Sequence, residues 1–414
     1  MNLFVGLDVS SESLDACFMG DSLDEIYLQG KFSNDTKGAS EIKQKILSLN
    51  SKHDFKKIVI GMEATSIYSF HPALFFQNDP ELTALDIKTN VENPRTIKKY
   101  ADSYDIDKTD TNDAFVIADF FRIGRGGHSV IREEEFMALQ QLTRARYQMV
   151  LQLVQTKQHF LQTLCYKVNT LSKELNATST SVFSATIIDL MTEELSLDDI
   201  AQMPLEEFAE LLQKKGRGRF KDPEKLAKVI KKAIRDSYRL GAKMTESIDT
   251  ILGIQAREIR ALKKSIKEFD KAIEDLVQTI PEYQCLTSIP GVGKVYAAGI
   301  LAEIGQIERF KDQANLAKYA GLTWSKNQSG NYNSENTPLN RSGNRYLRYY
   351  LVEAANSVIR HVPEYKAFYN KKAEEVPRNK HKRAVTLTAR KLTRLVYILL
   401  SGHQLYMPRE GDRG

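Results

Sequence analysis

Cysteine is scarce in this chain, and its three copies argue against two common architectures. Cys17, Cys165 and Cys285 are far apart and odd in number, so they do not suggest a framework of paired disulfides. None of them has the short spacing of a zinc site, and the seven histidines are equally scattered. Thiols with this distribution are typical of a reducing compartment, so we expect a cytoplasmic protein.

Long apolar runs are also missing. No run reaches the roughly 20 residues that a membrane-spanning helix needs, and the N-terminal residues have the pattern of a strand rather than a signal peptide. With 414 residues, 42% of them hydrophobic and 27% charged, the chain has the composition of a soluble protein with two or three domains. The net charge of +6 is a mild bias toward polyanions, so its distribution matters more than its size.

Four acidic residues in the first 113 positions carry most of the chemical information. Asp8 and Glu63 each follow an apolar run of strand length. Asp110 and Asp113 lie three residues apart in a helical segment. A carboxylate at the end of a buried strand is costly unless it has a partner, and Mg²⁺ prefers oxygen ligands of this kind. Because paired metal ions can clamp a phosphoryl group, the four residues predict metal-dependent phosphodiester chemistry.

The residues alone leave parts of this hypothesis open. Most Asp and Glu residues are solvated surface charges, and Asp110 followed by Asn112 is also typical of a helix start. The pair Asp107 and Asp110 has the same separation as Asp110 and Asp113, so spacing does not choose between them.

Residues 1–125 alternate between strand-sized apolar runs and helical stretches. Three early strands are close enough for an antiparallel meander, and the strands and helices after them alternate, which is the layout of a ribonuclease H-like fold. In that layout Asp8 lies on the central first strand and Glu63 at the end of the fourth. The pattern predicts strands at 2–9, 14–20, 25–33, 57–62 and 82–88, and helices at 37–50, 66–77, 92–101 and 110–124.

Residues 133–280 are expected to be helical. Apolar residues recur every three or four positions over 133–172 and again over 242–279, which predicts two long amphipathic helices in an antiparallel hairpin or coiled-coil arm. The basic section in 173–241, which includes 214–239, is either a solvated face or a phosphate-binding arm.

A third region, residues 282–403, opens with a helix-hairpin-helix pattern. Gly291 and Gly293 lie in the turn and Lys294 begins the next helix. Glycines allow a close backbone approach, and the N–H groups that open a helix can hold a phosphate. The pattern therefore predicts contact with a nucleic-acid backbone that does not read sequence.

Two further segments of this region are polar or basic. Arg341, Arg345 and Arg348 lie at an expected helix start, where they are placed to hold phosphates. The basic run at 366–394 is either a second nucleic-acid surface or a pair of solvated helices. Nothing in the residues themselves marks Ser329, in a turn-rich stretch, as a nucleophile.

Five motifs, taken in order, give the chain a family resemblance. They are Gly6-Leu7-Asp8, Glu63-Ala64-Thr65, Lys108 to Ala114 (KTDTNDA), Ile289 to Gly293 (IPGVG) and Gln328-Ser329-Gly330. This series resembles the DEDD-type insertion-sequence transposases, the bridge-RNA-guided recombinases. The resemblance covers 1–125 and 245–403. It implies a RuvC-like domain, a coiled-coil region and a C-terminal transposase domain.

The resemblance also implies a mechanism. It assigns Asp110 and Asp113, with Asp8 and Glu63, as ligands of Mg²⁺ that assists an in-line displacement at phosphorus. It makes Ser329 the nucleophile that forms a covalent link to DNA, with Ser342 as the weaker candidate. Donor and target DNA and a structured noncoding guide RNA are the implied partners, in a homo-oligomer (dimer or tetramer) associated with the bacterial nucleoid. No membrane is involved.

The segment 173–241 is longer than the connector that the family pattern leads us to expect, so its role stays open. Two other functions remain as alternatives. A metal-dependent nuclease of the Holliday-junction type would share the four carboxylates and need no serine. A noncatalytic nucleic-acid-binding protein would keep the carboxylates only as inherited scaffold, at an electrostatic cost.

Overall fold

The computed structural model describes residues 1–64, 67–104, 110–125, 133–192, 195–324, 328–329, 332–333, 339–340 and 342–408, with the backbone alone at 110–111, 328–329 and 332–333. By their internal contacts the residues divide into two units. One holds Met1–Met137 together with the chain from Ile304 onward, and the other is Ala138–Glu303. No helix in the described ranges is long and apolar enough to cross a membrane.

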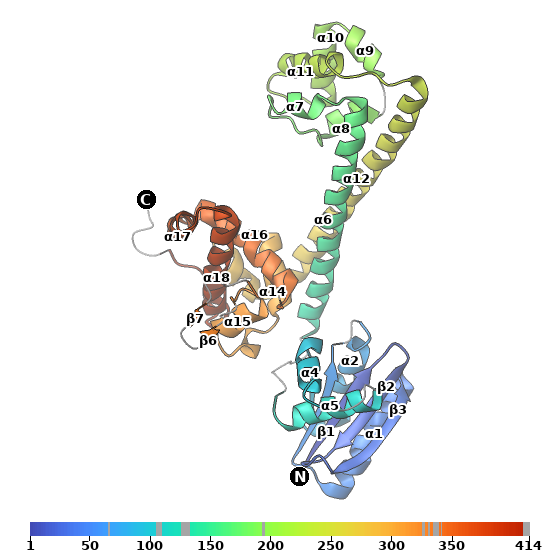
Figure 1. The fold of residues 1–414 in the computed structure, drawn as a ribbon, viewed down its shortest axis with the longest axis vertical. Coiled ribbons are helices and arrows are strands. Elements are labelled where there is room, and N and C mark those ends of the chain that lie inside the picture. The colour runs from blue at the N-terminus through green and yellow to red at the C-terminus, as the bar shows by residue number, and fades with distance from the viewer. Residues whose placement is uncertain are drawn as a thin grey trace. The chain divides into compact units, whose positions relative to one another are not determined.

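The N-terminal part is built on one mixed sheet (Figure 1). Its strand order is β3-β2-β1-β4-β5, with β1, β2 and β3 antiparallel and β1, β4 and β5 parallel. This is the layout that the sequence predicted for a ribonuclease H-like fold. The strands are β1 (Asn2–Val9), β2 (Ser13–Met19), β3 (Ile26–Ser33), β4 (Lys57–Glu63) and β5 (Lys88–Glu92).

Helices cover both faces of this sheet. Leu3, Val5 and Leu7 of β1 belong to a core with Ile42 of α1 and Phe76 of α2. Residues of the opposite parity face a second core, which includes Phe120 and Phe121 of α5. The side-chain period of two therefore separates the two faces of β1. The helices are α1 (Thr36–His53), α2 (Phe70–Asn78), α3 (Pro80–Ala84), α4 (Pro94–Ala101) and α5 (Asp110–Arg122).

One predicted strand was wrong. Residues 82–88 were expected to be extended, but Pro80–Ala84 is helix α3 and the strand runs from Lys88 to Glu92. The side chain of Asp79 accepts hydrogen bonds from the backbone N–H groups of Glu81 and Leu82, and Pro80 occupies the first turn. This N-terminal cap stabilises a helix where the apolar residues alone suggested a strand.

The unit Ala138–Glu303 contains most of α6 (Glu134–Lys167) and all of α12 (Ala242–Val277), the two long helices that the sequence predicted. Arg146 pairs with Asp270 at 2.5 Å. Lys167 pairs with Asp249 at 2.7 Å. These two ion pairs show that the helices lie side by side and antiparallel (Figure 1). A coiled-coil supercoil stays a prediction.

Five shorter helices connect α6 to α12, and we call residues 171–235 the helical module. Its residues share a core with both long helices, which includes Phe160, Phe208, Ile230 and Leu252. Two more helices follow α12 in this unit, α13 (Glu282–Thr287) and α14 (Lys294–Ile304). The helices of the module are α7 (Leu171–Leu175), α8 (Ala185–Thr192), α9 (Leu197–Gln202), α10 (Leu205–Lys215) and α11 (Pro223–Arg235).

The C-terminal part is mainly helical, and α18 lies at its centre. Ala389, Leu392 and Val396 on α18 are fully buried, and α15, α16 and α17 pack against this helix. Its elements are η1 (Ile307–Arg309), α15 (Gln313–Tyr319), β6 (Gln328–Ser329), β7 (Tyr332–Asn333), α16 (Arg345–His361), α17 (Pro363–Glu374) and α18 (Lys380–Ser401).

The three cysteines are free, as expected. Cys17 and Cys285 are buried and Cys165 is exposed. Burial raises the pKa of the Cys17 thiol to about 11, so this side chain is uncharged at neutral pH.

Candidate active site

Asp8 and Glu63 are brought together by the register of two parallel strands. Leu7 of β1 lies opposite Met62 of β4, so the next residues along, Asp8 and Glu63, are neighbours at the same end of the sheet. Residues that face each other in adjacent strands project from the same face. Both carboxylates are half-buried. The sheet therefore places two of the four predicted residues on one face, at the C-terminal ends of neighbouring strands.

Helix α5 packs against that same face. Gly6 precedes Asp8 by two residues, and a Cβ atom on Gly6 would overlap the backbone of Ala114 and Ala118. Gly61 precedes Glu63 in the same way, and a Cβ there would overlap the ring of Phe121. The missing side chains let α5 lie directly on the strands, beside the two carboxylates.

Asp113 lies in the first turn of α5, and Asp110 begins the helix one turn before Ala114. Asp110 and Asp113 therefore lie at the N-terminal end of α5, just before Ala114, which contacts Gly6. The side chain of Asp110 is outside the described residues, and Asp113 is half-buried. Among the described side chains, no group of three His, Cys, Asp or Glu residues is close enough to hold a metal ion.

The donor set nevertheless suits a hard divalent cation. All four side chains are carboxylates, and Mg²⁺ and similar ions prefer oxygen ligands. The backbone places Asp8 and Glu63 on the face against which α5 packs. Half-burial lowers the competition from water while leaving part of each described carboxylate accessible.

A further carboxylate on this face was not predicted from the sequence. Asp15 of β2 lies directly opposite Asp8 in the antiparallel register, so both project from one face. Its side chain is buried, accepts a hydrogen bond from the hydroxyl of Ser13 at 3.2 Å, and pairs with Lys31 at 3.6 Å. The alternation of β2 could have indicated this position, but only the register shows that it faces Asp8.

Asp119 is a second carboxylate that sequence reasoning missed. It lies on α5, is 1% exposed, and accepts hydrogen bonds from the hydroxyl groups of Tyr100 and Tyr104. The Nε atom of Arg122 donates to it at 2.7 Å. Burial alone would raise the pKa of Asp119, but these hydrogen bonds and the charge of Arg122 hold it below its ordinary value. The network ties α4 and the turn after it to α5, and so fixes the helix that carries Asp110 and Asp113.

Ser329 lies in a short hairpin of the C-terminal part. Gln328 pairs with Asn333 and Ser329 with Tyr332 in antiparallel register. An isolated bridge between Trp324 and Leu339 closes the base of this segment. The backbone of the predicted nucleophile thus belongs to the two-residue strand β6, while its side chain is outside the described residues.

The base of the hairpin is held by a close contact between two glycines. Gly321 has a φ of +68°, and a Cβ atom on it would meet Arg348 and the backbone of Gly343. A Cβ atom on Gly343 would overlap the backbone of Tyr319 and Gly321. This contact requires glycine on both sides and joins the chain before the hairpin to the chain after it.

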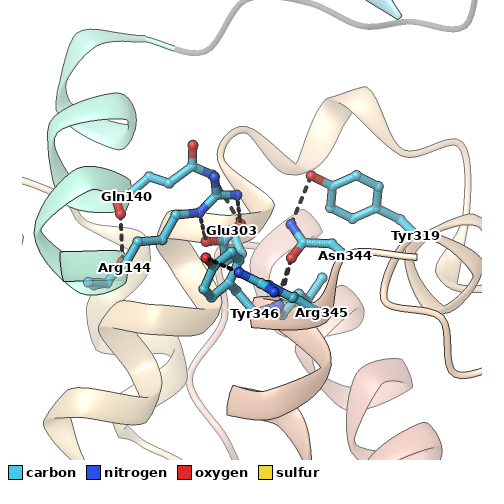
Figure 2. Close-up of polar contacts among 9 residues, drawn as sticks. Gln140, Arg144, Glu303, Tyr319, Asn344, Arg345 and Tyr346 are labelled. Carbon is cyan, nitrogen blue, oxygen red and sulfur yellow. Dashed lines mark hydrogen bonds and ion pairs between the residues drawn. The ribbon is translucent and has the colours of Figure 1, made fainter. Parts of the chain in front are cut away.

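The basic segment after the hairpin does begin a helix, as predicted. Asn344 caps α16 by accepting hydrogen bonds from the backbone N–H groups of Tyr346 at 2.9 Å and Leu347 at 3.1 Å. Its amide donates to the hydroxyl of Tyr319 at 3.1 Å (Figure 2). This capping role of Asn344 was not predicted from the sequence, although asparagine is a preferred residue at a helix N-cap.

The arginines of this segment differ in their surroundings. Arg345 is exposed, and its guanidinium lies 4.7 Å from the ring centre of Tyr346 and donates to its hydroxyl at 2.8 Å (Figure 2). Arg348 is half-buried and donates to the carbonyl of Ala320 at 3.3 Å. Arg341 lies outside the described residues. Ser342 donates its hydroxyl hydrogen bond to Asn340 at 2.6 Å in an exposed turn.

The predicted helix-hairpin-helix residues lie between α13 and α14. Gly291 has a φ of +93°, which explains the need for glycine in this turn. Gly293 has open space around its Cα, and Lys294 pairs with Glu274 of α12. A helix lies on each side of this turn, while the helix-hairpin-helix motif and its contact with nucleic acid stay predictions.

A buried ion pair in this unit was also missed. Glu303, at the end of α14, is fully buried and accepts two hydrogen bonds from Arg144 of α6, at 2.7 and 2.9 Å. Gln140 donates to the same carboxylate at 3.0 Å (Figure 2). The pair is more than 150 residues apart in sequence, so no local pattern predicts it.

Two family models match the chain at positions that contain these sites. A model of DEDD transposases of the IS110 type matches residues 5–166. A model described as the transposase IS116/IS110/IS902 family matches residues 283–370. The chain belongs to the IS110/IS116 family of DEDD transposases. All four predicted carboxylates of the transposase fall in the first matched segment, and Ser329 falls in the second.

The transposase is also similar to proteins of individual insertion elements. It is 25% identical over 326 residues to an uncharacterized 44.8 kDa protein of insertion element IS116 from Streptomyces clavuligerus, with 76% of each chain covered. It is 25% identical over 166 residues to the transposase for insertion sequence element IS1111A of Coxiella burnetii, covering 39% of this chain and 45% of the relative. A pilin gene-inverting protein of Moraxella bovis is 32% identical over 148 residues, 34% of this chain and 45% of that protein.

Family membership gives the transposase its general activity, the cleavage and transfer of DNA strands. The DEDD type of its first domain implies dependence on a divalent metal ion, commonly Mg²⁺. Neither matched segment includes residues 167–282, in which the helical module lies.

Proposed function

We propose that this transposase cuts and rejoins DNA through a covalent bond between DNA and Ser329, assisted by Mg²⁺ on its four carboxylates and guided by a structured noncoding RNA. The observation that carries the metal part is the placement of Asp8 and Glu63 on one face, at neighbouring strand ends, with α5 packed beside them.

Asp8, Glu63, Asp110 and Asp113 would hold the metal. When bound there, Mg²⁺ stabilises negative charge that develops on a phosphoryl oxygen during displacement. Asp119 acts on this group from a distance, because its hydrogen bonds fix α5 against the chain that precedes Asp110.

Ser329 would supply the nucleophile. Its oxygen forms a bond to phosphorus as the bond from phosphorus to one deoxyribose oxygen breaks, and the hydroxyl proton moves to a base. A deoxyribose hydroxyl of the partner strand then attacks the serine ester and releases the serine. Each step exchanges one phosphoester for another, so rejoining needs no other source of energy. A relative named for inverting a gene supports a reaction that rejoins both ends.

The start of α16 would bind the phosphates of the nucleic acid. No acidic residue lies in its first turn, which instead contains Arg345 and Arg348. Cations at a helix N-terminus oppose the macrodipole, whereas an anion there is favoured by both the dipole and the arginines. Gly291, Gly293 and Lys294 would make a second backbone contact of the same kind.

The long helices would join copies of the chain into a dimer or tetramer. Leu151 and Val154 on α6 are 45% and 47% exposed. Ile251 and Ile254 on α12 are 42% and 52% exposed. Apolar side chains at helical spacing on an open face are typical of a helix–helix interface.

The alternative is a metal-dependent nuclease without a covalent intermediate, and two variants separate it from our proposal. We expect Asp8→Asn to abolish cleavage and joining of a donor–target DNA pair. Ser329→Ala should abolish both as well, while its binding to the same DNA stays within twofold of the wild type. If Ser329→Ala still cleaves the DNA while Asp8→Asn does not, the metal-dependent nuclease is the correct function. Ser342→Ala serves as the matched control.

A further inference from the structure

The helical module contains a cavity of about 770 Å³. Figure 1 shows the helices of the module gathered where α6 ends and α12 begins. Two segments of the module line the cavity, residues 177–189 and residues 215–226. This volume lies within the range of ordinary ligand sites. Both segments lie outside the parts of the chain that the family models match.

The two lining segments contribute different chemical groups. The first contributes mainly hydroxyl groups, from Thr178 through Ser184. The second contributes cations, namely Arg217, Arg219, Lys221 and Lys225, all of them exposed. Hydroxyl groups and cations together form a surface of hydrogen-bond donors with a positive charge, which suits phosphate oxygens.

The acidic residues of the lining do not neutralise these cations. Asp189 is paired with Arg260 at 2.5 Å. Asp222 caps α11 by accepting a hydrogen bond from the backbone N–H of Lys225 at 2.8 Å. Within the part of the chain that the structure describes, the side chains of the four cavity cations make no ion pair and no hydrogen bond. The cavity therefore has an excess of positive charge.

The neighbouring basic residues of the module are engaged in a different way. Lys228 pairs with Glu224 at 2.5 Å, and Lys232 pairs with Glu174 at 2.8 Å. Lys231 donates to three backbone carbonyls. The basic run that the sequence showed as one feature is thus two: paired cations on α11 that stabilise the module, and unpaired cations at the cavity.

The backbone of the cavity loop is strained at one of these cations. Arg217 has a φ of 50° and precedes Gly218, whose φ is +71°. A left-handed conformation is unfavourable for a residue other than glycine because its Cβ atom crowds the backbone. An arginine at such a position is consistent with a function for its side chain.

From these observations we propose that the cavity binds the phosphodiester backbone of a nucleic acid, at a site separate from the carboxylates and from Ser329. Four cations spread along one loop and onto the start of α11 suit several consecutive phosphates better than a single one. Contacts of this type position a strand and carry no sequence information. RNA and DNA share the backbone chemistry, and the experiment below distinguishes them.

The test compares two variants of the full chain with equal changes in net charge. The cavity variant replaces Arg217, Arg219, Lys221 and Lys225 with alanine. The matched control replaces Lys228, Lys232, Arg235 and Arg239, which are exposed and paired; the first three belong to the module and Arg239 follows it. Binding of U30, dT30 and a 30-base-pair DNA duplex is measured by fluorescence anisotropy in EDTA over a series of salt concentrations.

We expect the cavity variant to bind at least one probe about tenfold more weakly at moderate salt. Its log–log salt slope should fall by about 3, because four lost phosphate contacts contribute roughly 0.7–0.9 each. The control should lose less than threefold. A loss with U30 alone identifies RNA as the partner, and a loss with the DNA probes alone identifies DNA. Equal losses in both variants with every probe would overturn the proposal, since they would reflect overall charge.

A second measurement uses the unmodified chain and needs no variant to fold. Lysine acetylation is followed by mass spectrometry with and without the probe that binds best. We expect protection of Lys221 and Lys225 and little change at Lys228. Unchanged reactivity at all three would contradict the proposal. Because no metal is present, Ser329→Ala should give the same protection, so a failure here leaves the proposed reaction untouched.

Discussion

The carboxylate region and the serine region of this transposase are built in different ways. Asp8 and Glu63 are fixed by strand register, and α5 is fixed above them by glycines that leave no room for a Cβ atom. Ser329 lies in the short β6–β7 pair, and the described residues on either side of this pair are joined by the Trp324–Leu339 bridge and the Gly321–Gly343 contact. Packing in a core fixes the positions of the carboxylates, whereas Ser329 lies in a short segment that is attached to a core.

This contrast indicates a division of labour. A metal site needs several ligands at fixed separations, which a sheet and a helix provide. A nucleophile that forms and then breaks a covalent bond to DNA has to meet two different strands in turn. A loop attached to a rigid base is suited to that task.

The largest effect that would test the contrast is on the carboxylates. Glu63→Gln keeps the size of the side chain but removes its charge, so we expect metal-dependent strand cleavage to fall about 1000-fold, or roughly 4 kcal/mol in the activation free energy. The melting temperature should change little. Cleavage rates at saturating Mg²⁺ measure the effect, with Glu41→Gln on α1 as the control. An equal loss of activity in the control would mean that overall charge, and not a metal ligand, was removed.

The next effect tests whether packing fixes the carboxylate region. Gly6→Ala would place a Cβ atom against the backbone of α5, which cannot yield as a flexible side chain can. We expect a destabilisation of the N-terminal part by about 3 kcal/mol. Hydrogen exchange of the α5 amides reports it. Gly30→Ala in the same sheet, where a Cβ would meet only the ring of Phe32, should be nearly neutral. Equal protection of the α5 amides from hydrogen exchange in both variants would refute the tight contact between Gly6 and α5.

The corresponding change in the serine region should be smaller. Gly343→Ala would overlap the backbone of Tyr319 and Gly321, and we expect a cost of about 2 kcal/mol, because a loop can relax in part. Strand transfer should fall more than metal binding does. Gly253→Ala on α12, where space is available, is the control for a glycine change in general. A loss larger than that of Gly6→Ala would contradict the distinction between the two regions.

The smallest effect concerns pH. The pKa of Asp119 is lowered in the folded chain, so its ionised form stabilises the fold above the pKa of the unfolded state, near 4, and this contribution is lost as pH falls through the folded pKa. Between pH 5 and pH 3 we expect the wild type to lose up to about 1 kcal/mol that Asp119→Asn does not lose, because the loss cannot exceed about 1.4 kcal/mol per pH unit below the unfolded-state pKa. Denaturation at both pH values measures the difference, and equal losses would exclude Asp119 as the cause.

The sequence predicted those residues that carry a local signal and missed those whose role depends on strand register or on a helix cap. Asp8 and Glu63 were found because each ends a strand-length apolar run, a signal that is local. Asp15 was missed because only the β1–β2 register shows that it faces Asp8. The strand expected at 82–88 was wrong because the cap at Asp79 outweighs an apolar pattern.

The roles of residues that depend on partners distant in the sequence could not be predicted from the sequence. The basic run of the helical module could not be divided in advance, because Lys232 meets Glu174 and Arg239 meets Asp198 across the fold. Ser329 was identified only through the family resemblance. A serine in a turn looks the same whether it caps the turn or attacks phosphorus.

The most direct test of the account is a search for the covalent intermediate. The full chain is incubated with Mg²⁺, the noncoding RNA from the DNA that flanks its gene and a labelled donor–target DNA pair, and is then denatured and digested. We predict label that survives denaturation and maps to the peptide containing Ser329, and that is absent in Ser329→Ala but present in Ser342→Ala. Cleaved DNA without any protein-bound label would contradict the account and identify the carboxylates as a nuclease that acts through water.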